Sequence, residues 1–184
     1  MDRYPDLPDL VKDGAFCLSD CNLFESAIRV LREAKKENIP IVLDAGSWKD
    51  QTGQYLALAD EVIASEDCRP PDSAQLPESA DSVKPMDFIA AAGYFGVENI
   101  AVTRGERPII WKDPHTEGVI EPIPVKAKDT LGAGDIFHGA YCFFRYEQNM
   151  PFPDSLRRAS EVASFSVRYF GPREGIKAYL GKNV

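Results

Sequence analysis

Residues 128–137 read KDTLGAGDIF. The run Gly132-Ala133-Gly134 stands directly before Asp135, and an apolar helical pattern follows, which predicts a turn that opens a helix. The first turn of a helix has unpaired N–H groups and partial positive charge, and glycines let an anion approach them closely. The sequence therefore predicts an anion hole for a phosphoryl group, with Asp135 beside it as a proton acceptor.

A plainer explanation of this turn stays open from the residues alone. Aspartate is common as a cap in the first turn of a helix, and glycines often mark loops. Two better-known phosphate motifs are absent. The chain has no GxxxxGK[ST] string, and Gly132-Ala133-Gly134 lacks the third glycine of a dinucleotide fingerprint.

Upstream of the turn, short apolar strands alternate with amphipathic helices. Continuous apolar runs predict strands at 15–18, 41–44, 61–64 and 99–103. Apolar residues at three- and four-residue spacing predict helices at 24–34, 56–59 and 86–94. Asn22 is the expected cap of the first helix, and the Pro- and Ser-rich stretch 69–85 is the expected loop. Strands that are apolar on both faces and alternate with helices indicate a parallel sheet covered by helices.

After residue 103 the alternation of apolar strands and helices stops, and long helical patterns return only from residue 133. Residues 108–111 and 118–125 predict a strand pair with a turn at Asp113-Pro114. Two long helical patterns follow, from about 133 to 146 and from about 153 to 170. We expect a single α/β domain over residues 1–184.

Composition narrows the class of protein. The 184 residues are 44% hydrophobic and 27% charged, which is typical of one soluble globular domain. The net charge is −8 and no Lys/Arg-rich run occurs, so we expect neither nucleic acid nor membrane as a partner. The pair Cys17-x-x-x-Cys21 has no second pair or nearby His to complete a zinc site. With no signal peptide or membrane-spanning stretch, we expect a cytoplasmic protein.

Several segments of the chain resemble those of a known family. Residues 129–135, DTLGAGD, resemble the C-terminal signature of the ribokinase-like (PfkB) carbohydrate kinases. Residues 44–46, DAG, resemble the aspartate-bearing strand end of that family, and residues 102–106, VTRGE, resemble its V-T-x-G segment on the nucleotide side. Residues 159–171 resemble the helix and glycine turn that close over the adenine. The resemblance covers most of the chain.

The resemblance implies an ATP-dependent kinase that transfers the γ-phosphoryl group to a hydroxyl of a small sugar, with Mg²⁺ on the phosphates. Asp135 matches the catalytic base, and Gly132, Ala133 and Gly134 match the anion hole. The residues that match nucleotide-binding positions are Thr103, Gly105, Glu106, Asp129, Thr130, Ser160 and Gly171. Thr103 and Gly105 also have a plain explanation, as the end of a strand and the site of a turn.

Two departures from the family pattern bear on function. Where the family commonly carries N-x-x-E, residues 65–68 read SEDC, so Cys68 replaces the metal-organising glutamate. Glu66 and Asp67 are the carboxylates that remain there, and Glu66 is our candidate metal residue. The arrangement of Mg²⁺ is therefore left open.

The second departure is length. The resemblance implies a ribokinase-like three-layer sandwich with a mostly parallel central sheet. The chain contains no Gly-Gly pair, and its start resembles the middle of such a kinase. We expect the C-terminal, nucleotide-binding half, without the N-terminal part and the lid. Such a half would pair with a separate N-terminal half or associate with itself. A non-catalytic nucleotide-binding fragment and a nucleoside kinase of the same fold are the alternatives.

Overall fold

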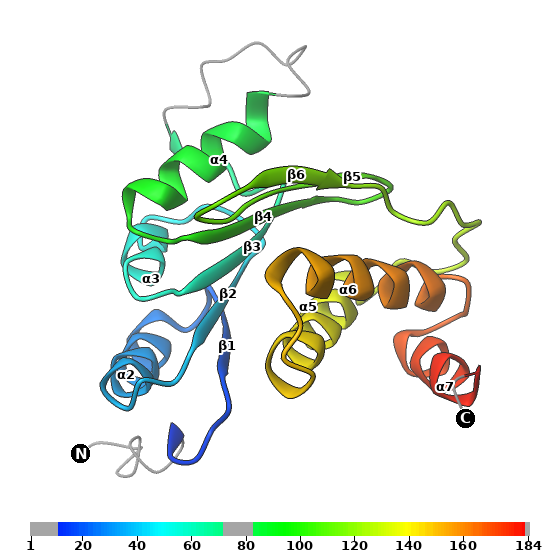
Figure 1. The fold of residues 1–184 in the computed structure, drawn as a ribbon, viewed down its shortest axis with the longest axis horizontal. Helices are drawn as coiled ribbons and strands as arrows, with labels where there is room; N and C mark the ends of the chain where they lie inside the picture. The colour runs from blue at the N-terminus through cyan, green and yellow to red at the C-terminus, as the bar shows by residue number, and fades with distance from the viewer. Residues whose placement is uncertain (1–10, 72–82, 183–184) are drawn as a thin grey trace. The chain divides into compact units, whose positions relative to one another are not determined.

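The computed structural model describes residues 11–71 and 83–182 (Figure 1). Its strands are β1 Cys17–Asp20, β2 Ile41–Ala45, β3 Glu61–Ser65, β4 Asn99–Arg104, β5 Arg107–Lys112 and β6 Glu117–Ile120. Its helices are α2 Phe24–Lys36, α3 Thr52–Leu56, α4 Val83–Tyr94, α5 Ala133–Cys142, α6 Phe152–Ser166 and α7 Pro172–Lys182, and a π-helical turn spans Phe143–Glu147.

The six strands form one mixed sheet in the order β1-β2-β3-β4-β5-β6. The first four strands are parallel, with Cys17 beside Ile41, Val42 beside Glu61 and Glu61 beside Asn99. Parallel neighbours need a crossover, and α2, α3 and α4 supply the three crossovers. Only two residues connect β4 to β5, a length that joins antiparallel strands.

Burial explains why the central strands are apolar throughout. Ile41, Val42 and Leu43 alternate between the two faces of β2, and all three are fully buried. One face packs against α2, α3 and α4, whose buried residues join it in a single core (Figure 1). Helix α2 contributes Ile28 and Leu31, which lie at the spacing that places side chains on one helical stripe.

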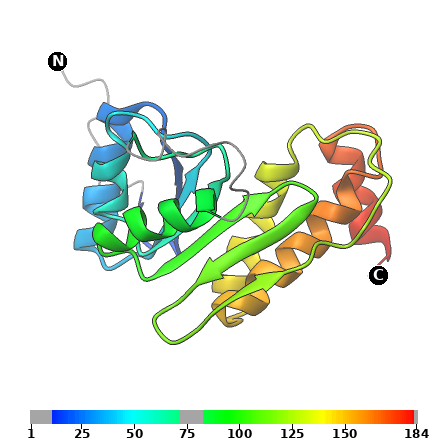
Figure 2. The ribbon, with the colours of Figure 1, turned by 90° about the horizontal axis from the view of Figure 1, so that it is seen from above.

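The contacts divide the chain into two compact units. The first runs to Arg104 and includes Ile110–Gly118; the second consists of Gly105–Ile109 and the chain from Val119 onward. Within the second unit, α6 contacts both α5 and α7, and Figure 2 shows α5 alongside α6. The rings of Tyr141 in α5 and Phe152 in α6 meet edge to face at 6.0 Å. The assignment of one domain to residues 1–184 stays a prediction.

The sequence predicted the α/β class and most elements, and the differences have local causes. Strand β6 ends at Ile120 and not at 125, because the prolines at 122 and 124 have no N–H group to extend a ladder. The last predicted helix ends at Ser166, and α7 was not predicted. Gly171, with a positive φ of 83°, lies directly before α7.

The cap of α2 was also predicted wrongly. Leu23 is the capping residue, in a left-handed conformation and without a side-chain hydrogen bond. The side chain of Asn22 binds Asp20 instead, with its Nδ2 donating to Oδ2 at 2.7 Å. Most of the expected loop 69–85 falls outside the described residues.

None of the described helices combines the length and the apolar character needed to cross a membrane.

Candidate active site

The predicted anion turn opens α5. Gly132 is the capping residue, and its carbonyl accepts the N–H of Ile136 at 3.0 Å, while the N–H of Ala133 donates to Thr130 at 3.2 Å. The amides of Gly134 and Asp135 follow in the first turn, where α-helical geometry offers no acceptor within the helix. Both residues are exposed, and a Cβ added at Gly134 would meet no atom within 4 Å. The turn therefore offers two amides that have no acceptor within the helix, on two exposed residues, one of which carries the Asp135 carboxylate.

Gly132 is required by both conformation and space. Its φ of 72° lies in the left-handed region that side chains rarely adopt. A Cβ there would also stand 3.3 Å from the Cβ of Pro172, the first residue of α7. Thus the start of α5 packs closely against the start of α7.

Asp129 fixes the same two segments to each other. Its Oδ1 accepts the N–H of Leu131 and its Oδ2 accepts the N–H of Gly171, each at 3.0 Å. The amides of Lys128 and Asp129 in turn donate to the carbonyl of Val167, at 2.7 and 3.2 Å. Both carboxylate oxygens are engaged with main-chain amides, so Asp129 positions the turn.

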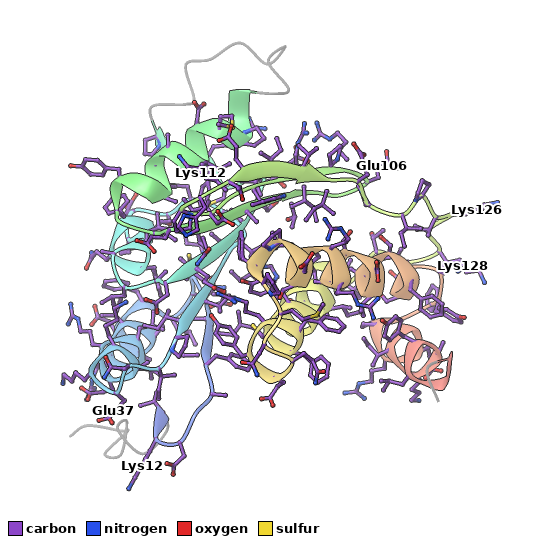
Figure 3. All side chains as sticks on the ribbon, in the orientation of Figure 1. Lys12, Glu37, Glu106, Lys112, Lys126 and Lys128 are labelled. Carbon is purple, nitrogen blue, oxygen red and sulfur yellow. The ribbon has the colours of Figure 1, made fainter. Side chains whose placement is uncertain are left out.

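The other predicted nucleotide residues of the second unit lie at different places. Thr130 is exposed and Ser160 is buried in α6. Gly105, with a φ of 65°, and Glu106 form the turn between β4 and β5, and the Glu106 side chain is exposed there (Figure 3).

Two exposed lysines lie on the segment that leads into α5. Lys126 and Lys128 point outward in Figure 3. They are the cationic side chains nearest in sequence to the turn. The turn itself carries no cationic side chain, so the donors that it offers to an anion are main-chain groups.

Thr103 and Glu66 belong to the first unit, at the carboxyl ends of β4 and β3. The Thr103 hydroxyl donates to the Ala64 carbonyl at 3.1 Å, and the Glu66 amide donates to the Thr103 carbonyl at 3.0 Å. The Glu66 carboxylate lies 4.0 Å from Nε of Arg104, whose side chain is only 10% exposed. The candidate metal carboxylate is therefore paired with a buried guanidinium.

The described residues thus bring the predicted site together in two groups. One group joins the α5 turn, Asp129, Thr130 and Gly171 in the second unit. The other joins Thr103 to Glu66 in the first unit.

The cysteines of the first unit are poor candidates for chemistry. Burial raises the pKa of Cys21 to about 11, with Lys49 opposing it in part, and burial raises the pKa of Cys68 to about 12. Thiols with such pKa values are protonated at neutral pH and make weak metal ligands. Across residues 11–71 and 83–182, no three His, Cys, Asp or Glu side chains are grouped to hold a metal ion.

Sequence reasoning missed two residues of these groups. Arg104 occupies the variable position of V-T-x-G, and only the structure reveals its pairing with Glu66. His138 follows Asp135 by three residues in α5 and is 6% exposed, with its Nδ1 2.8 Å from the Gly134 carbonyl. A histidine inside the apolar pattern of α5 was the available signal, because a buried polar group needs a partner.

Comparison with known proteins identifies the family of the chain. The family model described as "pfkB family carbohydrate kinase" matches residues 10–178. A ribokinase of Lactococcus lactis subsp. lactis is 38% identical over 77 residues, which cover 42% of this chain and 25% of that protein. A deoxyribokinase of Salmonella typhi is 36% identical over 72 residues, covering 39% and 23%. These matches span about a quarter of the length of each curated relative.

Solved structures share the fold. The ribokinase of Arabidopsis thaliana, complexed with ribose and ATP, superposes with a TM-score of 0.77 at 22% identity, over 93% of this chain and 55% of that one. The protein described as a ribokinase II from E. coli, in complex with ATP and Mg²⁺, gives a TM-score of 0.74 at 21% identity, over 95% and 61%. The ribokinase-like fold predicted from sequence is confirmed, and the chain belongs to the pfkB family of carbohydrate kinases.

Proposed function

We propose that this chain carries the nucleotide and phosphoryl-transfer side of an ATP-dependent kinase acting on a small sugar. The observation that supports this best is the turn Gly132–Asp135 at the start of α5, with Gly134 and Asp135 exposed, in a member of a family of carbohydrate kinases. The ATP found with the two solved ribokinases is consistent with it.

In this proposal the first turn of α5 receives the transferring phosphate. The amides of Gly134 and Asp135 would donate to its oxygens, and the helix dipole would favour the negative charge. The sugar hydroxyl oxygen would attack the γ-phosphorus, and the bond between that phosphorus and the oxygen that remains on ADP would break. Asp135 would accept the hydroxyl proton, as a general base does.

The remaining predicted residues take supporting roles. We assign Thr103, Gly105 and Glu106 to the phosphates and ribose of ATP. Thr130, Ser160 and Gly171 would lie around the rest of the nucleotide. Asp129 is assigned a positioning role, because both of its oxygens already accept main-chain N–H groups.

The residues present fit ATP better than a dedicated metal cage. The open space at Gly134 suits a phosphate, whereas Glu66 is paired with Arg104 and no triad of ligands occurs among the described residues. Protein-bound Mg²⁺ often uses few carboxylates together with substrate phosphates. Mg²⁺ would therefore be held chiefly by ATP here and would neutralise charge on the transferred group, with Glu66 available only if it leaves Arg104.

A half-subunit is the second candidate, and the position and exposure of strand β1 favour it. The chain covers 55% and 61% of the two solved kinases. Strand β1 lies at one end of the sheet order, and Leu18 in it is 40% exposed. Such an open edge can pair with another strand. A separate N-terminal half, or a second copy of the chain, would supply that strand and most contacts to the sugar.

We place the protein in the cytosol, where free cysteines such as its own persist.

Calorimetry with ATP tests the nucleotide assignment directly. Gly134→Asp adds a carboxylate at the open position of the turn and should lower ATP affinity by at least about tenfold, through blockage and charge repulsion. Gly139→Asp is the matched control, because Gly139 is also exposed in α5 and a Cβ added there would meet no atom of another segment within 4 Å. Equal ATP affinity in the wild type and in Gly134→Asp would refute the assignment.

A coupled ADP-release assay over pentoses, hexoses and nucleosides tests the reaction. Asp135→Asn should lower any sugar-dependent rate by about 10²–10⁴-fold, while Asn still serves in the first turn of a helix. ATP binding without any turnover, together with light scattering that shows self-association, would favour the half-subunit. Nucleoside-dependent turnover would favour the nucleoside kinase.

A further inference from the structure

His138 makes a second bond to a carbonyl that the helix already uses. Its ring is buried, and its Nδ1 lies 2.8 Å from the carbonyl oxygen of Gly134. A carbonyl can only accept, so Nδ1 carries the hydrogen. The main-chain N–H of the same residue points to the same oxygen, because residues 134 and 138 are four apart in α5.

These two hydrogen bonds to one carbonyl oxygen restrict the orientation of one peptide in the candidate anion hole. In a trans peptide the C=O of Gly134 and the N–H of Asp135 point in opposite directions. Whatever fixes that carbonyl therefore also fixes the Asp135 N–H, which then points toward the start of the helix. Helix ends fray, and glycine gives the main chain wide conformational freedom. A further hydrogen bond to the Gly134 carbonyl would therefore reduce the motion of this first-turn peptide.

We propose that His138 is a positioning residue that holds the Asp135 amide of the anion hole toward the phosphate through the Gly134 carbonyl. The inference rests on the proposed function for the identity of the anion. It assigns no contact between His138 and the nucleotide. A positioning role differs from that of an ordinary buried histidine in one respect. The hydrogen bond of His138 should raise the affinity for a phosphate at the turn and leave the affinity for the rest of the nucleotide unchanged.

Two variants separate the donor from the bulk of the ring. His138→Leu keeps an apolar side chain of moderate size and removes the donor, while the main-chain bond to Gly134 remains. His138→Asn places an amide nitrogen on the atom that corresponds to Nδ1, so it can restore the bond. His115→Leu is the control for losing a histidine elsewhere, because His115 is exposed between β5 and β6.

The first measurement is binding of ATP and AMP by calorimetry. His138→Leu should bind ATP about 3- to 10-fold more weakly, the size expected for one net hydrogen bond, while AMP affinity stays unchanged. His138→Asn should recover most of the ATP affinity. Unchanged ATP affinity in His138→Leu, equal losses for ATP and AMP, or no recovery in His138→Asn would each overturn the inference.

The second measurement needs no nucleotide. Amide order parameters from NMR should fall at Asp135 in His138→Leu and stay near the wild-type value in His138→Asn and His115→Leu. An unchanged order parameter in His138→Leu would overturn the inference. If the wild-type chain bound no ATP, the proposed function would fail while this measurement still decided whether His138 holds the peptide.

Discussion

Replacing Asp129 by alanine should weaken the second unit while leaving the first unit nearly unchanged. The Asp129 carboxylate joins the start of α5 to the segment before α7, which are 42 residues apart. Its two oxygens accept the amides of Leu131 and Gly171 at 3.0 Å. The variant removes both bonds and leaves a half-buried amide at Gly171 without its acceptor.

The size of the loss follows from where the two bonds lie. Hydrogen bonds to a charged group contribute about 1.5–3 kcal/mol each when water cannot replace them. The Gly171 bond is half-buried and belongs near that range, whereas the Leu131 bond is exposed and contributes less. We expect Asp129→Ala to lower the free energy of unfolding by about 2–4 kcal/mol. Asp129→Asn should lose about half as much, because an amide oxygen can still accept one of the two N–H groups.

Two optical probes can locate the effect. Both tryptophans, Trp48 and Trp111, lie in the first unit, whereas α5, α6 and α7 lie in the second. In urea, the part of the helical circular dichroism that comes from α5, α6 and α7 should therefore be lost from Asp129→Ala at lower denaturant than the tryptophan fluorescence changes, while the part from α2, α3 and α4 should be lost together with the fluorescence change. A variant within about 0.5 kcal/mol of wild type by both probes, or one that shifts only the fluorescence, would refute the reasoning.

Three further predictions concern other parts of the molecule. Gly175→Ala should destabilise the protein by about 1–3 kcal/mol in thermal unfolding, because its Cβ would lie 2.7 Å from a main-chain carbonyl of α6, whereas Gly181→Ala meets nothing and should stabilise α7 slightly. Cys21 and Cys68 should react with a maleimide at pH 8 at least about 100-fold more slowly in the native chain than in urea, since burial raises their pKa values. Burial raises the pKa of Asp113, but the hydrogen bonds from the His115 and Thr116 amides and the Thr116 hydroxyl together outweigh this effect and lower the pKa below its ordinary value. The stability that Asp113 contributes is thus present above its unfolded pKa and is lost as pH falls through the lowered value. A carboxyl NMR titration of the folded protein should show the lowered pKa of Asp113.

How far the sequence predicts this fold depends on how local each signal is. Strand β2 was predicted because a continuous apolar run with a proline before it is visible in five residues. Helix α7 was missed because its pattern is weakly amphipathic and includes Gly175 and Gly181. Its position depends on packing, since Gly175 allows the close approach of α7 to the end of α6. That contact has no signature in a linear pattern.

The candidate site divides in the same way. The turn from Gly132 to Asp135 is contiguous, so its motif is legible in the sequence. The hydrogen bond of Asp129 to Gly171 and the ion pair of Arg104 with Glu66 join segments about 40 residues apart, and only the folded chain brings these partners together. The assignment of Asp129 to the nucleotide rests on the resemblance and stays a prediction, while its observed bonds to two main-chain amides support the positioning role proposed for it.

The charge of the chain gives this local geometry its importance. A protein with a net charge of −8 has no general attraction for a polyanion such as ATP. The two cationic side chains nearest in sequence to the turn, Lys126 and Lys128, are exposed to solvent, where ions screen them. Arg104 is buried, but the carboxylate of Glu66 already pairs with it. In the proposed function, the oriented amides at the start of α5 would therefore contribute a large part of the phosphate affinity. This is why the orientation of a single peptide, between Gly134 and Asp135, should have a measurable effect on binding.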